Sequence, residues 1–122
     1  MVIINNTVFC WGGNALVGTA NYTNMPFYRC PLDTLQWALT QGNNTPLQRS
    51  NHVMFVYNGM VHVIGGHSAS ASLPYPSMAL FKLEVGNAYS TWRANDLRGV
   101  SPAPREGHTA TIWNVSTTLL RD

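Results

Sequence analysis

Short apolar runs separated by turn residues dominate the hydrophobic pattern of this chain. Residues 51–57 and 60–64 are apolar nearly throughout, and Asn58-Gly59 between them favours a tight β-hairpin turn, since both residues tolerate positive φ. A strand without strict alternation of apolar and polar residues is usually buried on both faces. The pattern therefore predicts an all-β chain built from short antiparallel strands.

The same pattern occurs twice along the chain. Four anchors recur in the same order, with offsets of 53, 53, 55 and 56 residues: 8–13 and 61–66, 27–32 and 80–85, Trp37 and Trp92, and 46–52 and 102–108. A recurrence at this spacing indicates a structural repeat of about 50 residues, because only the connecting loops vary in length.

Each unit is expected to hold four strands. The first strand covers 51–57 and again 108–113, the second covers 7–11 and 60–64, the third covers 27–30 and 78–85, and the fourth ends at Trp37 and Trp92. Both second strands stop at a glycine pair, Gly12-Gly13 and Gly65-Gly66, where the backbone must turn or approach another strand closely.

Four strands and a glycine pair in each unit resemble the kelch repeat. The resemblance rests on the two glycine pairs with the residues before them, on Trp37 and Trp92, and on the Pro-x-x-Arg-x-x-His runs that end at His52 and His108. It implies a partial kelch-type β-propeller, with two four-stranded antiparallel blades plus the start of a third. The glycine pairs, both tryptophans and both histidines are then expected to be structural.

The units divide the chain into three parts. Residues 1–49 form a first unit that is expected to lack its own first strand, 50–104 form a complete unit, and 105–122 begin a third, with 115–120 as a further candidate strand. A closed propeller needs four to eight blades. The chain is therefore expected to be a fragment of a longer propeller protein, or several copies close a ring, as three copies of two blades would.

Composition and charge exclude several functional classes. Charged residues make up 10% of the 122 residues and apolar residues 45%, with a net charge of +2. The seven basic residues are scattered, so no cluster suited to nucleic acid is present. The most apolar stretch, 52–64, is interrupted by Asn58, Gly59 and His62 and is too short to span a membrane. Four N-glycosylation sequons, at Asn5, Asn21, Asn43 and Asn114, weakly favour a secretory or extracellular parent protein.

The residue types that usually carry chemistry form no catalytic or metal-binding motif in the sequence. Cys10 and Cys30 align with Val63 and Leu83, which indicates core positions, although a disulfide between them stays open. His52, His62, His67 and His108 show no zinc-ligand spacing, and no nucleophile or phosphate-binding motif is present. We expect no cofactor, no metal and no catalytic residue.

The long connections are the candidate interaction site. Residues 14–26, 67–77, 38–48 and 93–104 are each 11 to 13 residues long, and loops of this length are often functional. In the kelch family such loops share one face, where a protein or peptide docks. The resemblance thus implies partner contacts from Arg49, Asn51, Arg105, Tyr22, Tyr75 and His67. The alternative is that both arginines only bond neighbouring carbonyl groups.

The sequence therefore predicts a non-catalytic protein-interaction module of kelch type. Two alternatives stay open. The chain could belong to a kelch-fold enzyme, resembling galactose-oxidase-like copper enzymes or sugar epimerases, and bound copper would distinguish that class. It could also be a truncated product without an independent function.

Overall fold

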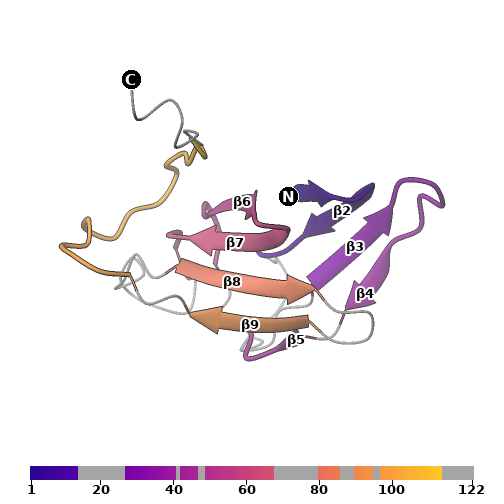
Figure 1. Cartoon of the computed structure of the whole chain (residues 1–122), viewed down its shortest axis with the longest axis horizontal. Coiled ribbons are helices and arrows are strands. Elements are labelled where there is room, and N and C mark those ends of the chain that lie inside the picture. Colours follow the sequence, from indigo (N-terminus) through magenta and orange to yellow (C-terminus); the bar gives the residue numbers. More distant parts are fainter. Residues whose placement is uncertain are drawn as a thin grey trace, which may run out of the picture.

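Two β-sheets make up the ordered framework of the protein in the computed structural model (Figure 1). The structure describes residues 1–13, 27–40, 42–46, 49–67, 80–85, 90–94 and 97–113. Sheet 1 is antiparallel, in the order β1 (Val2–Ile4), β2 (Thr7–Cys10), β3 (Phe27–Pro31) and β4 (Ala38–Thr40). Sheet 2 has the order β5 (Gly42–Asn43), β9 (Ser90–Ala94), β8 (Leu80–Val85), β7 (Met60–Ile64) and β6 (Val53–Tyr57), and only β5 runs parallel to its neighbour. The all-β prediction is confirmed for these residues, none of which is helical.

The first unit has its own first strand, contrary to expectation. β1 pairs with β2 in the register Val2↔Phe9, so sheet 1 contains a hairpin that corresponds to the β6–β7 hairpin of sheet 2. Its turn residues Asn5 and Asn6 have φ of 46° and 60°, close to the 50° and 69° of Asn58 and Gly59 in the β6–β7 hairpin. Asparagine tolerates this left-handed region, so Asn-Asn serves the same tight turn as Asn-Gly.

The ends of the units also differ from the sequence prediction. The fourth strand of the first unit follows Trp37 rather than ending there, and residues 38–48, expected to be a loop, contain β4 and β5. Residues 108–113, expected to be the first strand of a third unit, pair with no described strand and extend away from sheet 2 (Figure 1). A strand needs a neighbour to complete its hydrogen bonds. The candidate strand at 115–120 lies outside the described residues.

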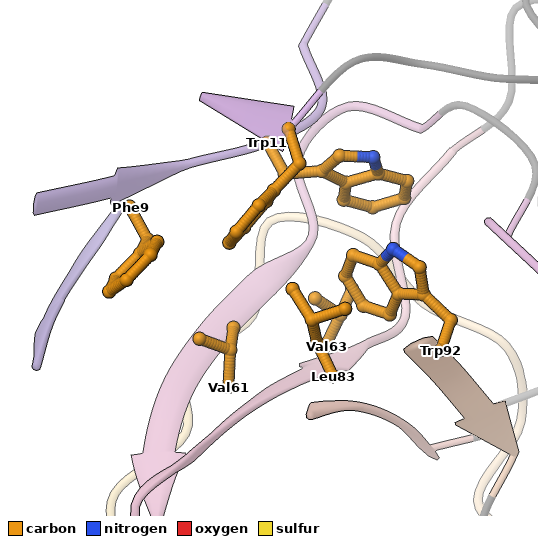
Figure 2. Packing of buried hydrophobic residues seen from close by; sticks show 7 residues of the cluster. Phe9, Trp11, Val61, Val63, Leu83 and Trp92 are labelled. Carbon is orange, nitrogen blue, oxygen red and sulfur yellow. The ribbon is translucent and has the colours of Figure 1, made fainter. Parts of the chain in front are cut away.

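The core lies between the two sheets. Side chains alternate between the faces of a strand, so the registers assign each residue to one face. Phe9 from sheet 1 and Trp11, which follows β2, are buried against sheet 2 (Figure 2). Phe27 of sheet 1 belongs to the same cluster and contacts Trp92. The residues of sheet 2 that complete this cluster are Val61, Val63, Leu83 and Trp92. We call these two contacting surfaces the inner faces of sheets 1 and 2.

Strand β7, which lies between β6 and β8 in sheet 2, is buried on both of its faces. Val61 and Val63 face the core, while His62 on the outer face stacks on Phe55 with ring centroids 5.2 Å apart. The imidazole also lies against Tyr57, and its Nδ1 is 3.1 Å from the Met60 carbonyl oxygen. The prediction of a strand buried on both faces is thereby confirmed for β7.

The two repeat-related tryptophans have very different environments. Trp92 is 1% exposed and contacts Trp11, with ring centroids 5.0 Å apart, and Phe27. Trp37 is 57% exposed, so it is not buried in the core as Trp92 is. Trp92 meets the inner face of sheet 1, whereas no described strand covers the outer face of sheet 1 beside Trp37.

Candidate functional site

Most of the candidate site residues lie at one end of the two sheets. β2 and β7 finish there with their glycine pairs, and the chain returns to the same place before each following unit. Gly12 has a φ of 83°, and a Cβ added to it would overlap the imidazole of His52 and lie 2.9 Å from the Arg49 carbonyl oxygen. The Gly13 N–H donates to that same oxygen at 2.9 Å. Only glycine fits both the backbone conformation and the space at position 12.

The same junction occurs a second time at the end of sheet 2. A Cβ on Gly65, whose φ is 71°, would overlap the imidazole of His108 and lie 2.9 Å from the Arg105 carbonyl oxygen. The Gly66 N–H donates to that oxygen at 3.0 Å. Gly12, His52 and Arg49 thus have counterparts in Gly65, His108 and Arg105, so the sequence repeat is also a repeat of contacts.

Arg49 lies inside the protein. Its side chain is 0% exposed, its Nη1 donates to the Gly65 carbonyl oxygen at 3.2 Å, and its guanidinium carbon is 5.0 Å from the centroid of the Phe81 ring. These contacts link the segment that leaves sheet 1 to the glycine pair and to β8 of sheet 2. The position of Arg49 favours the structural alternative over a contact with a partner.

Arg105, the repeat counterpart of Arg49, is exposed. Its Nε donates to the Ala103 carbonyl oxygen at 3.2 Å, within its own segment. Beside it, Asn51 donates from Nδ2 to Glu106 Oε2 at 3.0 Å, and the Gly107 N–H donates to the Asn51 carbonyl oxygen at 2.9 Å. The sequence did not indicate Glu106, because a lone acid in a loop has no pattern that predicts its partner.

The remaining candidates lie partly within this region. His67 is half-buried and forms an isolated antiparallel bridge with Ser50, with N–H to carbonyl distances of 2.8 Å in both directions. The structure therefore brings together Arg49, Asn51, His67 and Arg105. Tyr22 and Tyr75 lie outside the described residues.

Burial and nearby positive charge act on His52. Burial, aided by the positive charges of the Met1 amino group and Arg49, lowers its pKa from 6.5 to about 4, against opposing hydrogen bonds to the backbone of Arg49 and Trp11. His52 is therefore neutral at pH 7. A neutral imidazole suits its position against Gly12 and beside Trp11, whose ring centroid lies 5.4 Å away.

The cysteines and acids form no reactive cluster in the described part of the chain. Cys10 pairs with Tyr28 and Cys30 pairs with Val8, so the two free thiols lie on one face of sheet 1 but not directly opposite each other. Within the described ranges, no three His, Cys, Asp or Glu side chains are grouped closely enough to hold a metal ion.

Comparisons with known proteins add no assignment: no protein-family profile matches the chain, and no curated protein sequence matches it significantly. The described residues contain no helix that is long and apolar enough to cross a membrane.

Proposed function

We propose that the chain contributes two blades to a kelch-type β-propeller and acts as a non-catalytic module that binds a protein or peptide. The observation that carries the proposal is the repeated junction. Gly12, His52 and the Arg49 carbonyl form one set of contacts, and Gly65, His108 and the Arg105 carbonyl form the same set in the next unit. Blades that repeat around an axis require the same connection at each step.

The exposed side of this junction is the proposed contact surface. Arg105, Asn51 and Glu106 present a guanidinium, an amide and a carboxylate there, and all three residues are exposed. Arginine is enriched among the residues that dominate binding energy at interfaces. Because Arg105 bonds only one local carbonyl among the interactions described here, its remaining N–H groups suit carboxylate or carbonyl groups of a partner.

A peptide selection tests this proposal. Peptides selected from a random library against the folded chain are measured again with Arg105→Ala and with Arg98→Ala, a matched loss of an exposed arginine in the same segment. We expect the affinity to fall by roughly tenfold or more in Arg105→Ala and to stay unchanged in Arg98→Ala. Equal affinity in both variants, or no selectable binder at all, would overturn the proposal.

A further inference from the structure

The outer face of sheet 1 is an apolar surface that no described strand covers. The registers place Ile3, Val8 and Cys30 in one row across β1, β2 and β3, and Cys10, Tyr28 and Leu39 in a second row across β2, β3 and β4. Trp37 directly precedes β4, two residues before Leu39. Ile3, Tyr28, Trp37 and Leu39 are 60, 42, 57 and 54% exposed, whereas Cys30 on the same face is 6% exposed. The surface carries no charged side chain.

This uncovered face is the repeat counterpart of a covered one. With the offset of 53 residues, Ile3, Val8, Cys10, Tyr28 and Cys30 correspond to Val56, Val61, Val63, Phe81 and Leu83, and Trp37 corresponds to Trp92. The registers put all six counterparts on the inner face of sheet 2. That face is covered by sheet 1, which buries Val61, Val63, Leu83 and Trp92.

The face that does the covering also has a counterpart within the chain. Sheet 1 covers sheet 2 with Val2, Ile4, Phe9 and Phe27. Their counterparts on the outer face of sheet 2, again 53 residues later, are Phe55, Tyr57, His62 and Leu80. Arg29 and Lys82 add a cation at the same position on both of these faces, and the outer face of sheet 2 also carries the exposed ion pair of Glu84 and Arg93. No strand residue on the faces that they would cover is charged.

We infer that the outer face of sheet 1 binds the outer face of sheet 2 of a second copy of this chain. The contact reproduces between two molecules the packing that joins the two sheets within one molecule. It is heterologous, because the two copies contribute different surfaces, so each copy keeps one free face for the next. The inference concerns the sheet faces alone and goes beyond the partner contact proposed at Arg105.

The inference is tested by solution mass and by complementation. Light scattering after size exclusion is expected to give a mass that rises with concentration above the 13.5 kDa of one chain. Leu39→Lys on sheet 1 and Tyr57→Lys on sheet 2 each introduce an unpaired charge on one of the two faces. We expect each variant alone to associate about a hundredfold more weakly, because burying an isolated ammonium group is costly. Leu35→Lys, at an exposed apolar residue in a turn, is the matched control and should leave the association unchanged.

A mixture of the two variants gives the decisive result. The Leu39→Lys copy retains its sheet 2 face and the Tyr57→Lys copy retains its sheet 1 face, so together they should form a complex of two chains and nothing larger. A wild-type chain that stays monomeric at all concentrations would overturn the inference. Persistent association of Tyr57→Lys alone, or a mixture that stays monomeric while circular dichroism shows both variants folded, would also overturn it.

Discussion

The imidazole of His52 occupies the space where a side chain of Gly12 would lie. Gly12 follows β2 of the first sheet and His52 precedes β6 of the second, so this contact fixes where the chain enters the second unit. The backbone carbonyl oxygen of Arg49 borders the same space and lies 2.9 Å from the position of a Cβ added to Gly12. The connection between the units thus depends on the absence of one methyl group.

Gly12→Ala is expected to destabilise the protein by roughly 2–4 kcal/mol, through unfavourable φ and through overlap with His52 and the Arg49 carbonyl. Urea unfolding followed by circular dichroism measures the change. Gly13→Ala is the control, because Gly13 also has a positive φ, of 108°, but nothing lies within 4 Å of its added Cβ. Equal losses in the two variants would contradict steric packing as the reason for glycine at position 12.

Trp92→Ala is expected to cost roughly 3–5 kcal/mol, because it leaves a cavity between the two sheets beside Trp11 and Phe27. Trp37→Ala is expected to change the stability of the isolated chain by less than about 1 kcal/mol, since its ring is 57% exposed. Chemical denaturation of both variants at low protein concentration checks the difference. Similar losses would mean that Trp37 is buried in the folded monomer.

Arg49→Ala is expected to lower the free energy of unfolding by roughly 2–4 kcal/mol, because it removes the hydrogen bond to the Gly65 carbonyl and the contact with Phe81. The repeat-related change Arg105→Ala should have an effect within about 0.5 kcal/mol, because this arginine is exposed. Thermal unfolding of the two variants measures the contrast. A stable Arg49→Ala variant would argue against a structural role for the buried guanidinium.

The stability of the fold is expected to fall between pH 6.5 and pH 4 through His52. Its pKa is about 4 in the folded chain and 6.5 in the unfolded chain, so the unfolded state binds more protons across this window. The contribution is complete above pH 6.5 and is lost as the pH falls through the folded pKa. Because the group is partly exposed, roughly 2 kcal/mol is at stake. Urea midpoints measured across this range in the wild type and in His52→Gln should show a shallower pH dependence in the variant.

Much of the strand pattern could be predicted from local sequence. Asn58-Gly59, flanked by two apolar runs, indicated the β6–β7 hairpin directly, and the glycine pairs marked where β2 and β7 end. The β1–β2 hairpin was missed because Asn5-Asn6 is a weaker turn signal and β1 has only three residues. Its position 53 residues before Asn58 was the one signal that could have revealed it.

The candidate site was predictable as a region but not residue by residue. Repetition marked Arg49 and Arg105 as equivalent, yet one side chain is buried beneath the next unit and the other is exposed. The bond from Asn51 to Glu106 joins residues of different units, so no local pattern could indicate it.

The sequence by itself determined the all-β class, the spacing of the repeat and the positions reserved for glycine, because turn chemistry and alternation act between near neighbours in the chain. Only the tertiary structure decided which of two equivalent residues is buried. Trp37 and Trp92 are repeat counterparts in the sequence, but Trp37 precedes β4 whereas Trp92 lies within β9, and burial depends on whether another sheet lies against the side chain. Such a contact joins segments that are distant in the sequence, so the residues next to each tryptophan do not indicate it.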